Sequence, residues 1–222
     1  MFSVAIDGPT GAGKSTVAKA LAKELGFIYV DTGALYRAIG FRALSLGVDV
    51  YDKEAVEILL KEIVISIEYI GAVQHVFVNS KDVTDDIRTE RVSMAASAVS
   101  AHPAVRIYLL ELQRSFADTS NVIMDGRDIG TVVLPKADVK IFLTASSEER
   151  AERRFKELKA KGIEVDYDEV LSDLVKRDHN DSNRDIAPLK AAEDAFTIDS
   201  TDKGFNEVVG NILDIIREIR KA

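Results

Sequence analysis

The chain has no cysteine and no tryptophan, and only four prolines among its 222 residues. Without cysteine it can form no disulfide, thiolate nucleophile or thiolate metal site, a composition that suits a reducing cytosol. The chain also has no apolar run long enough to cross a bilayer. Its first residues enter a predicted strand at once, leaving no room for a signal peptide. We therefore expect a cytoplasmic protein with no membrane partner.

The chain also lacks an excess of basic residues. It has 29 lysines and arginines against 37 aspartates and glutamates, which gives a formal net charge of −8. We therefore expect no nucleic-acid partner. The hydrophobic fraction of 46% and the charged fraction of 30% are typical of a globular protein. The length allows one substantial α/β core with small inserted lobes. Any basic cluster in so acidic a chain stands out.

The most informative stretch fits the phosphate-binding loop pattern G-x-x-x-x-G-K-[ST]. It consists of Gly8, Pro9, Thr10, Gly11, Ala12, Gly13, Lys14, Ser15 and Thr16. Glycines let the backbone N–H groups turn towards phosphate oxygens, while the lysine reaches the β- and γ-phosphates and the Ser15 hydroxyl ligates Mg²⁺. A strand predicted over 2–6 and a helix over 15–25 flank the loop, as anion binding requires. A glycine-rich turn without chemistry is the alternative, and these flanks disfavour it.

Strands and helices alternate along most of the chain. Further buried strands are predicted at 27–30, 122–124, 139–143 and 195–198. Helices are predicted at 34–46, 52–62, 88–100, 104–116, from 146 or 147 to 161, at 166–184 and at 206–220. Alternating residues between 64 and 78 predict a small antiparallel lobe. We expect a parallel sheet covered on both faces with the first strand central, which is an α/β fold.

Charged residues gather where predicted strands end, the edge at which open parallel sheets bind ligands. Tyr36 and Arg37 follow one strand end, and Asp125, Arg127 and Asp128 follow another. Asp125 has the position of a Walker B carboxylate. Ordinary packing with solvated or internally paired charge is the alternative.

Two later segments add more cations. Arg150, Arg153 and Arg154 lie on one side of a helix, where they form either a lid over phosphates or a solvated, salt-bridged surface. If the next helix persists, Arg177, Asp181 and Arg184 share a face. The three histidines show no ligand spacing, and we expect them to be structural. The residues by themselves predict phosphoryl transfer from a nucleoside triphosphate to a phosphorylated acceptor.

Six segments together resemble the bacterial cytidylate kinases, which are P-loop nucleoside monophosphate kinases. They read AIDGPTGAGKST, DTGALYR, RTERVSMAASAVSAHPAVR, MDGRDIGTVV, KIFLTASSEERAERR and RDHNDSNRDIAPL. The resemblance spans nearly the whole chain. It implies a three-layer P-loop NTPase fold in one domain, with a core of residues 1–62, 85–145 and 185–222. A monophosphate-binding insert would cover about 63–84, and a helical lid about 146–184. It also implies a monomer that phosphorylates CMP and dCMP with ATP, giving CDP and dCDP.

The resemblance further implies a role for each matching residue. Arg37, Arg127 and Arg184 would hold the acceptor phosphate, whose oxygens planar guanidinium groups match. Ser97, Arg106 and Asp128 would contact the base, Arg177 and Asp181 the ribose, and Thr32 and Tyr36 would line this pocket. Catalytic roles would fall to Lys14, Arg127, Asp128 and the lid arginines 150, 153 and 154. Mg²⁺ would be held by Ser15 and, through water, by Asp125.

Two other functions remain open. One is a kinase on the same scaffold with a different monophosphate, a sugar or a shikimate-type acceptor. The other is a regulatory nucleotide switch that hydrolyses slowly without an acceptor. The sequence shows no evident switch segment, and the second set of arginines has no purpose in a switch.

Overall fold

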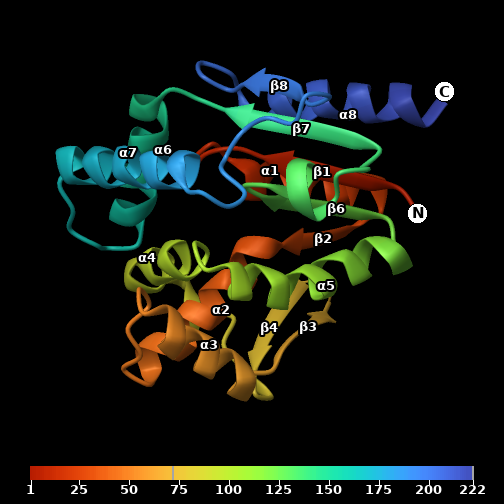
Figure 1. The fold of residues 1–222 in the computed structure, drawn as a ribbon. Coiled ribbons are helices and arrows are strands. Elements are labelled where there is room, and N and C mark those ends of the chain that lie inside the picture. Colours follow the sequence, from red (N-terminus) through yellow and green to blue (C-terminus); the bar gives the residue numbers. More distant parts are fainter. Residues whose placement is uncertain (72, 222) are drawn as a thin grey trace.

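The computed structural model describes residues 1–71 and 73–221, and within them a five-stranded parallel sheet forms the centre of the molecule (Figure 1). Its strands are β1 (Ser3–Asp7), β2 (Ile28–Asp31), β6 (Val122–Gly126), β7 (Val139–Thr144) and β8 (Phe196–Asp199). Their order is β2-β6-β1-β7-β8, so β1 is central. This confirms the predicted α/β fold and places the loop that follows β1 at the middle of the sheet.

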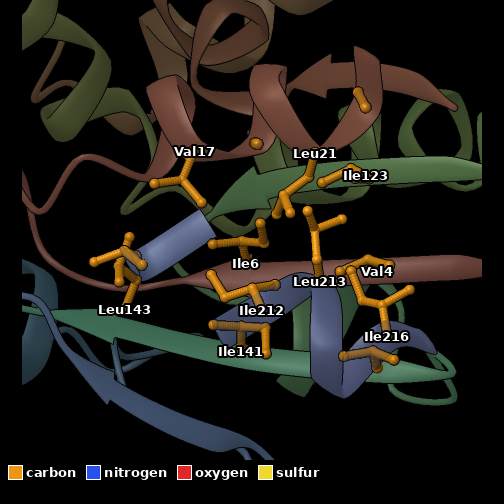
Figure 2. Packing of buried hydrophobic residues seen from close by; sticks show 14 of the residues in the cluster. Val4, Ile6, Val17, Leu21, Ile123, Ile141, Leu143, Ile212, Leu213 and Ile216 are labelled. Atoms are coloured by element: carbon orange, nitrogen blue, oxygen red, sulfur yellow. The ribbon is translucent and has the colours of Figure 1, made fainter. Parts of the chain in front are cut away.

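Both faces of the sheet are buried, and successive residues of β1 face opposite sides. Val4 and Ile6 pack with α1 (Lys14–Leu25) and α8 (Phe205–Lys221), as Figure 2 shows. Ala5 packs on the other face, where α5 (Pro103–Thr119) and the π-helix η2 (Ile129–Val133) contribute. These are the three layers expected from alternating strands and helices.

A second core lies under a small antiparallel sheet of order β3-β4-β5. Its strands are β3 (Ile65–Ile70), β4 (Val73–Val78) and β5 (Lys81–Asp82). They pack with α2 (Thr32–Ser45), α3 (Lys53–Glu62), α4 (Glu90–Val99) and the start of α5. The predicted antiparallel lobe is confirmed, although β4 begins three residues before the predicted 76–78. The boundaries proposed for core, insert and lid stay a prediction.

The last two helices before β8 pack against each other and project at one side of the sheet (Figure 1). They are α6 (Ser147–Ala160) and α7 (Tyr167–Asn183). Ser146 accepts from the N–H of Glu149 and Asp166 from those of residues 168 and 169, so a side chain caps each helix start.

Two expected helices differ at one end. The helix predicted over 88–100 is α4, but it starts two residues later: Arg88 closes a 3₁₀ turn η1 (Asp86–Arg88), and the Thr89 hydroxyl then caps α4. Helix α7 stops at Asn183, and Arg184 is extended with φ −68° and ψ 143°. Arg184 therefore does not continue a helical face with Arg177 and Asp181, and loop geometry sets its direction instead.

Candidate active site

A cavity of about 820 Å³ opens at the carboxyl ends of β2 and β6, beside the loop that follows β1. The phosphate loop, α2, η1, α4, α6 and α7 supply most of its wall. All ten residues predicted for the acceptor nucleotide line it: Thr32, Tyr36, Arg37, Ser97, Arg106, Arg127, Asp128, Arg177, Asp181 and Arg184. So do Thr10, Gly11, Gly13, Lys14, Ser15, Thr16 and Asp125. Gly8, Pro9 and Ala12 of the predicted loop lie outside this wall.

The phosphate loop has the backbone that its glycines allow. Gly8 has φ +148°, and a Cβ there would lie 1.9 Å from the Leu143 carbonyl oxygen, so no other residue fits. Gly13 has φ +87° and precedes α1 without a side-chain cap. The first N–H groups of α1 are therefore left for an anionic ligand.

Lys14 and the pair Ser15–Asp125 lie at this end of the cavity. The Lys14 ammonium is buried and donates to the Pro9 carbonyl at 2.7 Å. Burial, with the nearby Arg127 guanidinium, lowers the pKa of Lys14 to about 7. Ser15 Oγ donates to Asp125 Oδ2 at 2.7 Å, and Tyr29 donates to Oδ1 at 2.9 Å. Burial and the nearby Asp31 carboxylate raise the pKa of Asp125.

Four arginines, Arg37, Arg127, Arg177 and Arg184, surround the middle of the cavity, and three of them have a buried nitrogen that donates to no group in the described part of the chain. Arg37 donates to the Asp31 carboxylate at 2.7 Å. Arg127 donates both to the Asp181 carboxylate at 2.9 Å and to the hydroxyl of Thr10 in the phosphate loop at 2.6 Å. Among the described residues, Nε of Arg37, Nε of Arg177 and Nη2 of Arg184 are buried without a hydrogen-bond partner. Burial and the Arg127 charge lower the pKa of Arg177 to about 10.

Several arginine charges held this close together are unfavourable unless an anion balances them. Asp181 supplies part of the negative charge: burial works to raise its pKa, but Arg127 and Arg177 hold it below the usual range. Asp181, four residues after Arg177 on α7, forms its ion pair with Arg127. Arg177 is therefore left with unsatisfied donors.

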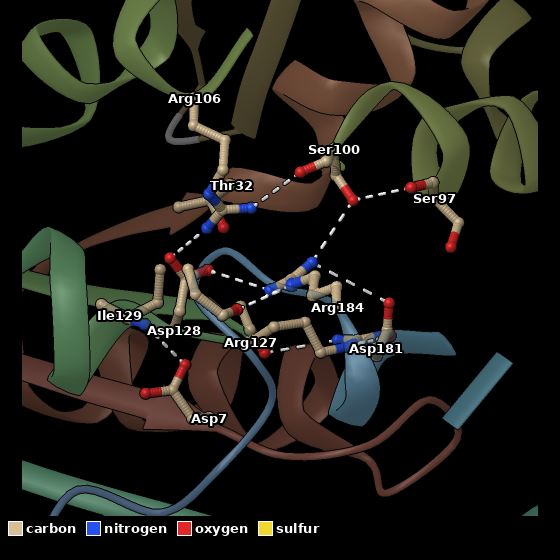
Figure 3. A network of polar contacts seen from close by, with 12 residues as sticks. Asp7, Thr32, Ser97, Ser100, Arg106, Arg127, Asp128, Ile129, Asp181 and Arg184 are labelled. Atoms are coloured by element: carbon tan, nitrogen blue, oxygen red, sulfur yellow. Dashed lines mark hydrogen bonds and ion pairs between the residues drawn. The ribbon is translucent and has the colours of Figure 1, made fainter. Parts of the chain in front are cut away.

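The far end of the cavity is built around Asp128 (Figure 3). Its carboxylate is buried, forms a short ion pair with Arg106 and lies 3.6 Å from Arg184. Arg106 also donates to the Ser100 carbonyl at 3.1 Å and lies 5.7 Å from the centre of the Tyr36 ring. Ser97 lines the same wall, where its carbonyl accepts from the Ser100 hydroxyl.

The three lid arginines differ in their surroundings. Arg150 is buried, donates to the carbonyls of Thr10 and Ala145, and pairs with Asp178 at 2.6 Å. It lies outside the cavity wall and ties the phosphate loop to the lid. Arg153 and Arg154 do line the cavity, and Arg154 pairs with Glu90 and Glu157. The same helix also carries surface ion pairs such as Lys156–Glu152, so part of it is the solvated, salt-bridged surface that we gave as the alternative to a lid.

Sequence reasoning missed several polar groups of this site. Asp31 is buried, accepts from Arg37 and from Arg88 at 3.2 Å, and pairs through its backbone with Gln74 of β4. Asp7, Tyr29 and Ser100 were also not singled out. The signal that identified Asp125, an acidic residue closing a buried strand, fits Asp7 and Asp31 equally well.

Two expectations concern features outside the site. In the described part of the chain, His75 pairs with Asp82 and His102 bonds the Val50 carbonyl, as structural histidines do. Over the same residues, no helix combines the length and apolar character needed to span a bilayer.

A phosphate loop and a separate group of arginines thus share one cavity at the edge of a parallel sheet. This arrangement defines the class as P-loop phosphotransferases with an anionic acceptor. Residues 4–218 match the family model described as cytidylate kinase. The cytidylate kinase of Bacillus pumilus is 50% identical over 220 residues, which cover 99% of this chain and 98% of that protein. That of Carboxydothermus hydrogenoformans is 52% identical over 213 residues, 96% of each. The chain belongs to the cytidylate kinase family.

Solved structures agree on the fold. A gluconokinase from Sinorhizobium meliloti aligns with a TM-score of 0.50 at 15% identity, covering 99% of this chain and 94% of that one. At this identity the likeness concerns the fold alone.

Proposed function

We propose that this chain transfers the γ-phosphoryl group of ATP to CMP and dCMP, giving CDP and dCDP. The family supports the reaction. The observation that carries the proposal is the half-buried Arg177 guanidinium, whose Nε is buried without a hydrogen-bond partner in the residues that the structure describes, near the charges of Arg127 and Arg37. A nucleotide phosphate placed there supplies the missing negative charge. A switch protein without an acceptor would leave this cluster unbalanced.

The geometry supports direct transfer between two nucleotides lying end to end. Arg127 spans the two halves, because one guanidinium contacts Thr10 of the phosphate loop and Asp181 beside the acceptor arginines. An acceptor phosphate oxygen is already anionic, so no general base and no covalent intermediate are needed. The work of the site is to bring two anions together and neutralise their charge.

The donor end fits a Mg²⁺ ion as the cofactor. Ser15 Oγ and a buried Asp125 carboxylate lie 2.7 Å apart, and these hard oxygen donors suit Mg²⁺ held partly through water. When bound, Mg²⁺ would neutralise charge on the donor phosphates. Tyr29 keeps the other Asp125 oxygen in place, so the carboxylate cannot rotate away from Ser15.

The choice between cytosine and uracil follows from the Asp128–Arg106 ion pair at the acceptor end of the cavity. Cytosine presents an amino donor where uracil presents a carbonyl acceptor. The Asp128 carboxylate accepts from the amino group and repels the carbonyl, while Arg106 keeps Asp128 in place. We propose that Asp181 and Arg177 face the ribose, and that Arg153 and Arg154 fold over the donor phosphates. We also propose that the protein is a cytoplasmic monomer.

A coupled assay of ADP release tests the function. CMP, dCMP, UMP, AMP, gluconate and shikimate are compared as acceptors at equal concentration, with a Lys14→Ala preparation as the control for contaminating kinases. We expect CMP and dCMP to give the highest kcat/KM and ATP hydrolysis without acceptor to be far slower. Better turnover of AMP or of a non-nucleotide acceptor would refute the proposal, and hydrolysis as fast as transfer would favour a switch.

A further inference from the structure

Asp7, the last residue of β1, holds a turn that lies more than a hundred residues further along the chain. Its two carboxylate oxygens accept from the backbone N–H groups of Ile129 and Gly130, each at 2.7 Å. Figure 3 shows the bond to Ile129. The Asp7 side chain is buried, with 4% of its surface exposed. It lies outside the cavity wall, so it does not contact a nucleotide there.

The turn that Asp7 holds is unusual. Residues Ile129–Val133 form a π-helix, a wide turn found in short pieces and often at functional sites. Its first N–H groups have no partner within the helix, and no side chain of the preceding residue caps them. Asp7 provides acceptors for the first two of these N–H groups from a neighbouring strand.

This turn determines where the Asp128 carboxylate points. Asp128 immediately precedes the π-helix, and its φ of −143° and ψ of 28° belong to neither a helix nor a strand. Its carbonyl accepts from the N–H groups of Val132 and Val133. The backbone of Asp128 is thus fastened through the turn that Asp7 anchors, while its side chain reaches Arg106.

Space beside Gly130 is also tight. A Cβ on Gly130 would lie 3.4 Å from Asp7 Oδ2 and 3.2 Å from Lys140 Cδ. The turn therefore lies close to the Asp7 carboxylate and the Lys140 side chain of β7, with little room for a larger residue at position 130.

We propose that Asp7 is a positioning residue for pyrimidine choice: by holding the turn 129–130, it aims Asp128 at the base. The inference rests on the proposed function, because it assumes that Asp128 reads the base of a CMP acceptor. Asp7 acts through hydrogen bonds to the backbone, so its loss should affect the acceptor end more than the donor end.

The test compares kcat/KM for CMP and UMP in wild type, Asp7→Asn and Asp7→Ala, together with KM for ATP. Asp7→Ala removes both acceptors, and we expect the CMP-over-UMP ratio to fall at least ~10-fold, since small misplacements of site groups have large effects on rate. Asp7→Asn keeps one acceptor oxygen and should give a smaller fall. KM for ATP should change less than KM for CMP in both variants.

Val4→Ala is the matched control. It removes a fully buried side chain from the same strand and lowers Tm, but it touches neither the turn nor Asp128, so the ratio should stay at the wild-type value. Hydrogen exchange gives a second readout: the amides of residues 129 and 130 should exchange faster in Asp7→Asn and unchanged in Val4→Ala. If Asp7→Ala does not fold, Asp7→Asn and Gly130→Ala, which crowds the same contact, provide the comparison.

The outcomes separate the two proposals. A wild-type protein with no preference for CMP defeats the proposed function, and this inference with it. A wild-type preference that survives in a folded Asp7→Ala or Asp7→Asn variant overturns this inference alone, even where the two amides exchange faster. Equal losses with CMP and ATP would also overturn it, because a positioning role at the base end predicts an unequal effect.

Discussion

Arg154 of α6 lies 2.7 Å from Glu90 at the start of α4, so an ion pair joins two walls of the cavity. The two residues are 64 positions apart, and both line the cavity. Arg154 is 27% exposed and also pairs with Glu157, so its guanidinium is held by two carboxylates. In the proposed role of Arg154, donor phosphates compete with these carboxylates for its guanidinium.

We therefore predict that Glu90→Gln lowers KM for ATP by about two- to fivefold, the factor that corresponds to one partly exposed ion pair. The reason is that Arg154 then has to leave only one carboxylate, that of Glu157, to reach a phosphate. Steady-state kinetics at saturating CMP measure it. Glu152→Gln, which breaks the Glu152–Lys156 pair on the same helix, is the control and should leave KM unchanged. A higher KM in Glu90→Gln would instead mean that the pair holds the lid in its binding position.

Lys14→Ala should lose at least ~10² in kcat, because the cation expected to contact the transferring phosphoryl group is removed. The fold should not weaken in parallel. Burial lowers the pKa of Lys14 to about 7, so near neutral pH the charged ammonium destabilises the folded state. Replacement by alanine removes this destabilisation. Single-turnover rates and urea unfolding measure the two effects, with the exposed Lys23→Ala as control. A variant that keeps wild-type kcat would show that Lys14 does not contact the phosphates.

Asp128→Ala should reduce the preference for CMP over UMP. The carboxylate that accepts from the cytosine amino group is lost, and so is its repulsion of the uracil carbonyl. Stability should fall by about 3–5 kcal/mol, because Arg106 is left buried without its ion pair. The kcat/KM ratio of the two nucleotides is the measurement, and Asp128→Asn keeps the side-chain volume as a comparison. An unchanged ratio would place base reading elsewhere.

Asp7 should make stability depend on pH. Burial raises the pKa of its carboxyl from 3.8 to about 6, although the N–H groups of Gly130 and Ile129 work to lower it; Asp128 and Lys14 are the charged groups nearby. The folded state thus binds this proton more tightly than the unfolded chain. The stabilisation is fully present below about pH 4 and is lost as pH rises through 6.

A rise in the pKa of Asp7 from 3.8 to about 6 corresponds to about 3 kcal/mol of stability. The free energy of unfolding of wild type minus that of Asp7→Asn should therefore fall by about this amount between pH 4 and pH 7. Urea unfolding of both proteins at several pH values in this range measures the difference. Parallel curves for the two proteins would contradict the raised pKa of Asp7.

Much of the fold and of the donor site could be predicted because the signals are local. The pattern from Gly8 to Thr16 needs only neighbouring residues to form its turn, and the strands of the sheet are short apolar runs between helices. Where predictions failed, the cause was tertiary. Arg184 lies outside helix α7, and its Nε donates to the Ala187 carbonyl in the loop beyond. The π-helix that follows Asp128 has no periodic signature, and it depends on acceptors from another strand.

The sequence alone determined the phosphate loop, the alternation of strands and helices, and which residue types can bind phosphate and base. Only the tertiary structure decided which charges meet. In the folded chain Asp181 pairs with Arg127, and Arg150 is buried against the phosphate loop. Asp7 accepts from the backbone of a turn more than a hundred residues away. The physical reason is that hydrogen bonds and ion pairs act over a few ångströms in space. Sequence patterns record only neighbours along the chain, and folding brings distant residues within that range.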